Sequence, residues 1–219
     1  MISAAFFDLD RTLISVISGN ALVRTAWRKR LIAPEDMYKA FLLYMKYKLT
    51  LRAPLDVISE MTAWVRGRKE SELEELCRIA TVELLLPSIH AGAFSEITRH
   101  RESGRKTVIL SSALDHICRA IAAELGMDDY ICSSLEAVDG YLTGRPAGRI
   151  CFGPEKLSRL TGYCRTEGID ISLSWYYTDA ISDLPVLEVV GHPVCVNPDR
   201  ALRKEALYRG WPVLSWKVS

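Results

Sequence analysis

Short apolar runs alternate along the chain with longer stretches of helical periodicity, and this pattern indicates an α/β fold. The segments SAAFFDL, KTVILSS and LSWYYTD are apolar on both faces, as strands are when helices cover both sides of a parallel sheet. Each of them ends in small or acidic polar residues. Because ligands of open α/β sheets bind at the carboxyl ends of the strands, polar residues at these ends carry the most weight.

The stretch from about residue 14 to residue 86 has helical periodicity and no strand signal. Helices are expected over 34–48, over 54–67 and from Ser71 onward, where Ser71 and Glu74 form a capping-box pattern. This stretch therefore predicts a helical insertion between the first strand and the rest of the α/β unit.

The domain boundaries follow from this insertion. Residues 1–13 and 87–219 are expected to form a three-layer, Rossmann-like core around a parallel sheet, and residues 14–86 an all-helical cap subdomain. Neither a repeat nor a low-complexity linker interrupts the pattern.

The second half of the chain adds smaller elements. A helix is expected to end at Gly126, and EAVDGYLTG predicts a hairpin whose turn is formed by Asp139 and Gly140. HPVCVNP is expected to be the last strand.

Composition narrows the class of protein. The chain has 219 residues, 49% of them hydrophobic, and its 28 basic and 27 acidic side chains nearly cancel. No overall field favours nucleic acid or an anionic membrane as the partner. No apolar run approaches the roughly 20 residues that span a bilayer, and the start of the chain lacks a signal-peptide pattern. Six scattered cysteines suit a reducing compartment, so we expect a soluble, cytoplasmic protein.

Four aspartates follow two of the predicted strands. Asp8 and Asp10 share a face if the first strand continues, and Asp179 and Asp183 become neighbours if a helical turn follows the third. Taken singly, Asp10 is explained as a turn cap, Asp179 as a helix N-cap and Asp183 as a solvated helix residue. Gathered together, carboxylates repel one another unless a cation joins them, and oxygen ligands favour Mg²⁺.

The motifs DLDRTL, VILSS, GPEK and YYTDAISDLP occur in the order of the four-motif signature of the haloacid dehalogenase (HAD) superfamily, which this chain resembles over essentially its whole length. VDGYLTGRPAGRICFGPEK and the helical insertion resemble the subfamily that includes phosphoserine phosphatase. The resemblance implies a Rossmann-like core with an inserted C1-type cap and a Mg²⁺-dependent phosphatase.

Carried over to this sequence, the resemblance makes Asp8 the nucleophile that forms an aspartyl-phosphate. Asp10 becomes the acid that protonates the leaving oxygen and the base that then activates water. Mg²⁺ is expected to bind Asp8, the backbone carbonyl of Asp10 and Asp179, with Asp183 as a further ligand or as support. The residue at Arg11 varies in the family and is not expected to matter much.

Three further residues match the family's phosphate contacts. Ser111, with Ser112 beside it, matches the motif that hydrogen-bonds a phosphate oxygen, although a serine there is equally explained as a helix N-cap. Lys156 matches the lysine that neutralises the nucleophile and the developing charge, whereas a lysine taken alone is usually a surface residue.

The substrate is expected to be a small phosphorylated metabolite, selected by the cap. Phosphoserine phosphatases usually carry glycines after the serine, where this chain has Ser112 and Ala113, so no substrate is assigned. The basic run RTAWRKR fits either an anionic ligand or, as such runs more often are, a solvated helix face.

Two alternatives to hydrolysis stay open. The first is a phosphate-binding or regulatory module without turnover, and the second is phosphotransfer to an acceptor other than water. The sequence lacks the Cys-x₅-Arg, Arg-His-Gly, HExxH and P-loop patterns of other phosphoryl-transfer and hydrolytic sites. Oligomeric state is not readable from the sequence.

Overall fold

The core of the protein is a parallel six-stranded sheet in a computed structural model that describes residues 2–32 and 63–218. The strand order is β3-β2-β1-β6-β7-β8, and each neighbouring pair is parallel. The strands are β1 (Ala4–Phe7), β2 (Lys106–Leu114), β3 (Asp129–Ser133), β6 (Trp175–Thr178), β7 (His192–Val196) and β8 (Val213–Leu214). The predicted fold class is confirmed.

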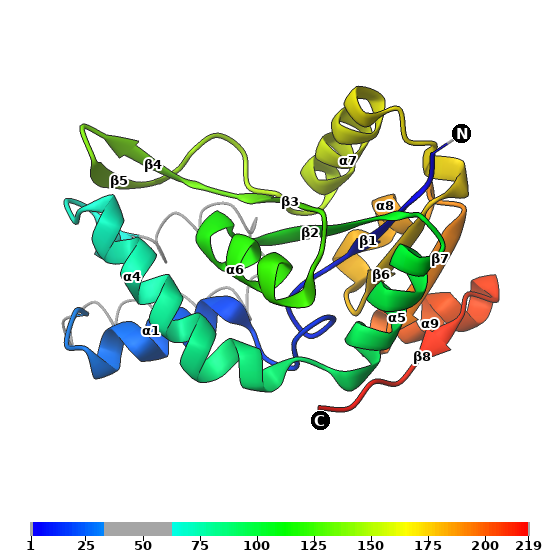
Figure 1. The fold of residues 1–219 in the computed structure, drawn as a ribbon, viewed down its shortest axis with the longest axis horizontal. Coiled ribbons are helices and arrows are strands. Elements are labelled where there is room, and N and C mark those ends of the chain that lie inside the picture. Colours follow the sequence, from blue (N-terminus) through cyan, green and yellow to red (C-terminus); the bar gives the residue numbers. More distant parts are fainter. Residues whose placement is uncertain (1, 33–62, 219) are drawn as a thin grey trace.

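Helices cover both faces of the sheet and make the fold three-layered (Figure 1). Ala4 and Phe6 belong to one buried cluster and Ala5 and Phe7 to the other, because successive side chains of a strand point to opposite faces. The Phe6 face packs against α7 (Pro154–Glu167), α8 (Leu184–Leu187) and α9 (Arg200–Arg209). The Phe7 face packs against α5 (Ala91–Glu102) and α6 (Asp115–Leu125).

The predicted turn residues lie where the backbone needs them. Helix α6 ends at Gly126, whose φ of 62° is left-handed. The hairpin of β4 (Leu135–Val138) and β5 (Tyr141–Pro146) turns at Asp139 and Gly140, with φ values of 50° and 78°. HPVCVNP forms β7, but it is not the last strand, because two residues of β8 pair with Cys195 and Val196. A strand of two residues is too short to show an alternating pattern.

The described part of the insertion is helical. Helices α1 (Ser18–Arg28) and α4 (Glu70–Ala80) pack together. The short turn η1 (Ala63–Val65) precedes α4, and η2 (Thr81–Leu85) and η3 (Leu86–Ser88) follow it. The helix expected over 34–48, and all but the end of that expected over 54–67, lie outside the described residues.

The capping-box prediction was wrong. Helix α4 begins one residue earlier, at Glu70, with Lys69 in the N-cap position and no side-chain cap. Backbone pairing explains the shift, because Glu70 N donates to Gly140 O (3.0 Å) and Lys69 forms a β-bridge with Tyr141. The hairpin, rather than a serine side chain, therefore fixes where this helix starts.

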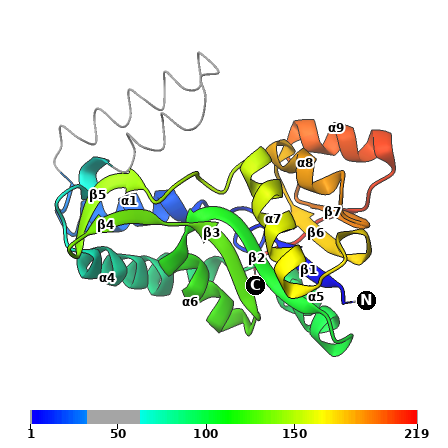
Figure 2. The same cartoon turned by 90° about the horizontal axis from the view of Figure 1, so that it is seen from above.

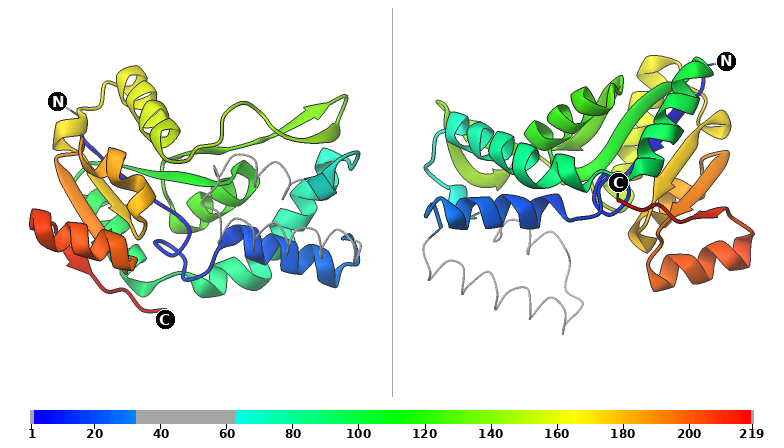
Figure 3. Two further views of the ribbon diagram at one scale, coloured as in Figure 1. Left: turned by 180° about the vertical axis from the view of Figure 1, so that it is seen from behind. Right: turned by 60° about the horizontal axis from the view of Figure 1, so that its bottom comes forward.

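Two connections join the insertion to the core, and they lie side by side. Ser15 N donates to Ser88 O (2.9 Å), and Ile14 forms an antiparallel bridge with Ile89. The C-terminal segment after β8 runs back to the same place, where Ala91 N donates to Lys217 O at 3.0 Å (Figure 3). The C-terminal segment is thus tied to the base of the insertion.

The β4–β5 hairpin reaches from the core to the insertion (Figure 2). Gly67 N donates to Leu142 O and Leu142 N donates to Arg68 O, both at 2.8 Å. Core residues therefore hold the helical insertion at a second place. Among the described residues, no helix is long and apolar enough to cross a membrane.

Replacement of Gly191 by alanine should lower the melting temperature. A Cβ there would lie 1.8 Å from the backbone oxygen of Ser172, so the chain between α8 and β7 must shift. We expect a loss of about 1–3 kcal/mol of unfolding free energy. Gly162→Ala, inside α7 with open space around its Cβ, is the control and should stabilise the helix by about 0.5–1 kcal/mol. Thermal unfolding checks both, and a neutral Gly191→Ala would contradict this packing.

Candidate active site

Asp8 stands at the carboxyl edge of the sheet, directly after the central strand β1. Its backbone N donates to Tyr177 O at 2.9 Å, so the chain still pairs with β6 at this point. The side chain is only 6% exposed. An apolar strand buried on both faces thus carries a carboxylate to an edge with little water.

Lys156 joins Asp8 to Asp183. Its Nζ donates to Asp8 Oδ1 at 2.8 Å and to Asp183 Oδ2 at 2.7 Å. Lys156 is 3% exposed and Asp183 1% exposed. Helix α7 supplies the lysine from its first turn, and the short turn η5 (Ile181–Asp183) after β6 supplies the aspartate. The structure therefore brings three of the predicted site residues into direct contact.

Asp10 is held by the start of the helical insertion. Its Oδ1 accepts a hydrogen bond from Ser18 N (2.9 Å), the first residue of α1. The loop between them winds tightly, because the amides of Thr12, Leu13 and Ile14 all donate to Leu9 O. One hydrogen bond thus connects the start of α1 directly to the Asp10 carboxylate.

Asp179, Ser111 and Ser112 complete the predicted set. Asp179 directly follows β6 and is 6% exposed, and its carboxylate accepts no hydrogen bond from another residue that the structure describes. Ser111 lies inside β2 rather than at a helix N-cap, is buried, and its Oγ accepts from Ala113 N at 3.3 Å. Ser112 is half-buried. The parallel register places these segments beside Asp8, since Phe7 pairs with Ile109 and Tyr177.

Burial controls the titration of the carboxylates. It raises the pKa of Asp8 to about 7, against the opposing charge of Lys156 and with a smaller upward contribution from Asp183. Burial likewise raises the pKa of Asp179 to about 7, and Arg11 acts against this rise. The pKa of Asp10 is also raised by burial, although the Ser18 hydrogen bond opposes the shift.

The lysine behaves in the opposite way. Burial alone would lower the pKa of Lys156, but the charges of Asp183 and Asp8 outweigh it and raise that pKa well above its ordinary value. Lys156 is therefore a fixed positive charge at neutral pH, between two carboxylates.

The donor set suits Mg²⁺ better than a softer metal. The described residues contain no ready cluster of three or more His, Cys, Asp or Glu side chains around one metal position. Asp8 and Asp179 nevertheless present buried carboxylate oxygens at one edge, and Asp8 Oδ2 is free of hydrogen bonds from described residues. Mg²⁺ is usually held by one or two carboxylates together with water and phosphate oxygens, so these residues fit it.

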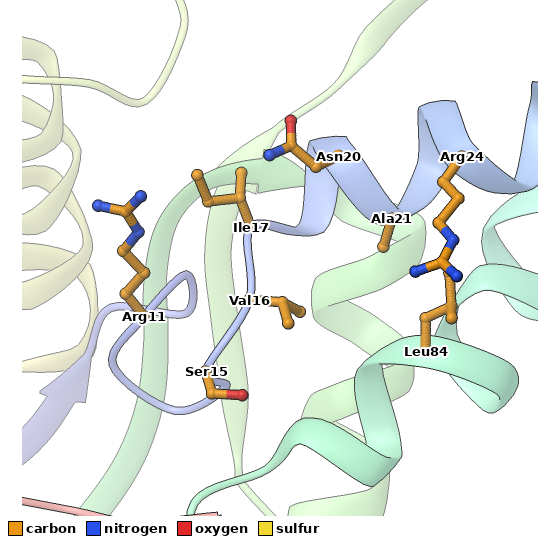
Figure 4. A pocket seen from close by; sticks show the side chains of 8 residues that line it. All are labelled: Arg11, Ser15, Val16, Ile17, Asn20, Ala21, Arg24 and Leu84. Carbon is orange, nitrogen blue, oxygen red and sulfur yellow. The ribbon is translucent and has the colours of Figure 1, made fainter.

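A groove of about 340 Å³ runs along the start of α1 (Figure 4). Val16, Ile17 and Ala21 form part of its wall, and Arg11 and Arg24 lie towards its two ends. Both charged side chains in the described lining are thus cationic, which suits a neutral or anionic group. Arg28 of the basic run pairs instead with Glu83 at 2.9 Å.

The sequence reasoning did not identify three residues that organise this edge. Tyr176 and Thr178 donate to Asp183, and Asp199 accepts from Ile181 N while its own N donates to Asp179 O. The signal for the first two was present, because positions 176 and 178 of a strand share a face. Asp199 is remote in sequence and gave no such signal.

The chain belongs to the haloacid dehalogenase-like hydrolase family, whose model matches residues 5–188. A Mycobacterium tuberculosis protein named as a probable phosphatase is 33% identical over 98% of this chain and 75% of its own length. A histidinol-phosphatase of Neisseria meningitidis is 31% identical over 99% of this chain and 100% of its own. The chain is thus a hydrolase of this family, and both of these relatives are named as phosphatases.

Solved structures agree with the fold. A Bordetella pertussis protein of unknown function has a TM-score of 0.89 at 25% identity and covers 98% of both chains. A phosphoserine phosphatase solved as an analogue of its phospho-aspartyl intermediate has a TM-score of 0.72 at 16% identity, covering 100% of this chain and 95% of its own. The second likeness shows the shared fold alone.

Asp179→Asn should raise the melting temperature of the metal-free protein at pH 8. The raised pKa of Asp179 means that stability from this group is present at acidic pH and is lost as pH rises through about 7. An ionised Asp179 then costs up to about 4 kcal/mol, and each kcal/mol moves the melting temperature by about 2–4 °C at this size. We expect a rise of about 5 °C or more at pH 8 and a clearly smaller rise at pH 5, where the carboxyl is ionised in the unfolded chain but still protonated in the folded protein.

The measurement is thermal unfolding in EDTA at both pH values. Asp139→Asn, at the exposed hairpin turn, is the matched control and should change neither melting temperature. A fall at pH 8 for Asp179→Asn would show that burial is not the dominant influence on this carboxyl.

Proposed function

We propose that this protein hydrolyses a small phosphomonoester in two steps, with Asp8 as the nucleophile and Mg²⁺ as the cofactor. The observation that carries the proposal is the buried bridge from Lys156 Nζ to Asp8 Oδ1 (2.8 Å) and Asp183 Oδ2 (2.7 Å) at the carboxyl edge of the sheet. A buried lysine holds one oxygen of Asp8 and leaves the other to attack.

In the first step Asp8 Oδ2 attacks the phosphorus and the ester oxygen leaves, taking a proton from Asp10. The product is an aspartyl-phosphate and a free alcohol. In the second step Asp10 takes a proton from water, whose oxygen attacks the phosphorus and releases phosphate and Asp8. The burial of Asp10 raises its pKa and favours the protonated carboxyl that the first step needs.

Three side chains are proposed to hold the phosphate. Lys156 offsets the charge that develops on the phosphoryl oxygens, while the hydroxyl of Ser111 and that of Ser112 donate to them. Mg²⁺, held by Asp8, the backbone carbonyl of Asp10 and Asp179, would supply the positive charge that lets an anionic carboxylate approach an anionic ester. Asp183 is proposed to support this site through its hydrogen bond from Lys156 Nζ.

Residues 14–86 are proposed to act as the cap over a core of residues 1–13 and 87–219. The hydrogen bond from Ser18 N to Asp10 Oδ1 supports a coupling between cap position and acid–base chemistry. The substrate is proposed to be a small phosphorylated metabolite, and the cytoplasm the compartment, since all six cysteines are buried free thiols.

Asp8→Asn should reduce turnover by at least about 10³-fold, because the amide cannot form the acyl-phosphate. Phosphate release is measured for wild type and variant on histidinol phosphate, phosphoserine and p-nitrophenyl phosphate, each with Mg²⁺ and with EDTA. EDTA should abolish wild-type turnover, and Mg²⁺ should restore it.

Two results would contradict this mechanism. Metal-independent turnover, or turnover retained by Asp8→Asn, excludes the proposed chemistry. A folded wild type that binds phosphate but releases none from any ester supports the binding-module alternative. Transfer to an added alcohol at the expense of phosphate release supports the phosphotransferase alternative.

Asp10→Asn should separate the two steps on p-nitrophenyl phosphate. This ester has a good leaving group, so the first step needs little proton donation, whereas activation of water still needs the base. We expect a burst of about one equivalent of p-nitrophenol followed by turnover about 10²–10⁴-fold slower than wild type. Rapid-mixing absorbance measures the burst, and the Asp8→Asn variant, which cannot form the intermediate, should show none. Equal loss of burst and turnover would remove Asp10 from the second step.

A further inference from the structure

Asp183 receives three hydrogen bonds on a single oxygen. Its Oδ2 accepts from Lys156 Nζ at 2.7 Å, from the Tyr176 hydroxyl at 2.6 Å and from the Thr178 hydroxyl at 2.7 Å. The residue is 1% exposed. These three donors fix the carboxylate as a partner of the lysine.

Tyr176 makes two contacts with this group. Its side chain is fully buried in the core that faces α7, and its hydroxyl donates into the site. Its ring centroid lies 5.6 Å from Lys156 Nζ. A phenol placed there is costly without a partner, because a buried hydroxyl needs a hydrogen bond. Tyr176 thus links the apolar core to the charged site through a buried hydroxyl that depends on its hydrogen bond to Asp183.

We propose that Tyr176 is a positioning residue for Lys156, acting through the carboxylate of Asp183. This inference rests on the proposed phosphatase function, in which Lys156 contacts the phosphoryl group. The hydroxyl fixes the carboxylate and shares its negative charge, so Asp183 holds the ammonium in place without drawing it away from Asp8 and the phosphate. Charge-assisted hydrogen bonds are strong enough for such competition between acceptors to set the lysine's position.

The chain provides a matched control in the next residue. Tyr177 is equally buried, but its hydroxyl lies on the other face of the sheet, where it donates to Glu96 at 2.7 Å and accepts from Arg99 at 2.9 Å. Each Tyr→Phe substitution removes one oxygen from a buried, hydrogen-bonded tyrosine of the same strand. The two variants therefore differ mainly in which cluster loses a donor.

The first test compares Tyr176→Phe with Tyr177→Phe in steady-state kinetics on the best ester of the panel, together with thermal unfolding. Tyr176→Phe should lower kcat about tenfold with KM within about twofold, because the lysine's contact with the reacting group strengthens in the transition state. Tyr177→Phe should keep kcat within about twofold of wild type, whatever its melting temperature. An unchanged kcat for Tyr176→Phe, or equal losses in both variants, overturns the proposal.

The second test asks whether Tyr176 acts through Asp183. In an Asp183→Asn background, Tyr176→Phe should cost less than about twofold in kcat, since coupled residues are not additive. If Tyr176→Phe lowers kcat by the same factor in the Asp183→Asn background as in wild type, the two residues act independently, and the proposal that Tyr176 acts through Asp183 is overturned. Where Asp183→Asn turns over too slowly, the same cycle is measured on the affinity for inorganic phosphate by calorimetry.

Failure of this inference differs from failure of the proposed function. If wild type releases no phosphate from any ester, the phosphatase proposal fails, and the phosphate-affinity cycle still tests Tyr176. If wild type turns over and depends on Asp8, but Tyr176→Phe behaves as Tyr177→Phe does, the inference alone fails.

Discussion

The ion pairs of the buried Lys156 ammonium with Asp8 and Asp183 are the interaction on which the rest of the candidate site depends. Burying a charge is tolerated only when partners replace the lost water, and here Asp8 and Asp183 do so at 2.8 and 2.7 Å. The lysine lies in the first turn of α7, while its partners follow β1 and β6. The helix, the strand order and the η5 turn must therefore all be in place before any of these charges is stable. This one contact ties the geometry of the site to completion of the fold.

The sequence predicted the parts of this edge that have local signatures. Asp8 follows an apolar run, Gly126 ends a helix, and Asp139 with Gly140 turns a hairpin, each for a reason contained in a few neighbouring residues. The strand β2, by contrast, continues through Ser111 to Leu114, because pairing with β3 extends it beyond its apolar run. The start of α4 was missed for the same kind of reason, since the hairpin sets it.

Polar contacts between residues far apart in the sequence were the main feature that the sequence did not predict. Sequence periodicity indicates that Tyr176 and Thr178 share a face, but it does not say what they meet there. The answer is Asp183, whose Oδ2 accepts hydrogen bonds from both hydroxyls and from Lys156. Arg11, expected to be unimportant, opposes the burial-induced rise in the pKa of Asp179 and lines the groove at the start of α1. The influence of Tyr176, Thr178 and Arg11 depends on which segments the fold places side by side, and this is not contained in the neighbouring sequence.

Charge balance at this edge explains why the proposed chemistry needs a cation. Asp8, Asp10, Asp179 and Asp183 face Lys156 and the more distant Arg11, so the carboxylates outnumber the cationic side chains placed among them. Burial reduces this excess of negative charge, because it raises the pKa values of Asp8 and Asp179 to about 7 and so favours their protonated forms. A protonated Asp8 is a poor nucleophile, however, and a phosphate dianion would add to the excess negative charge. A divalent cation held by Asp8 and Asp179 would resolve both problems, because it would favour ionised carboxylates and offset the charge of the ester. In the proposed enzyme the burial that destabilises the free site is therefore what makes metal and substrate binding favourable.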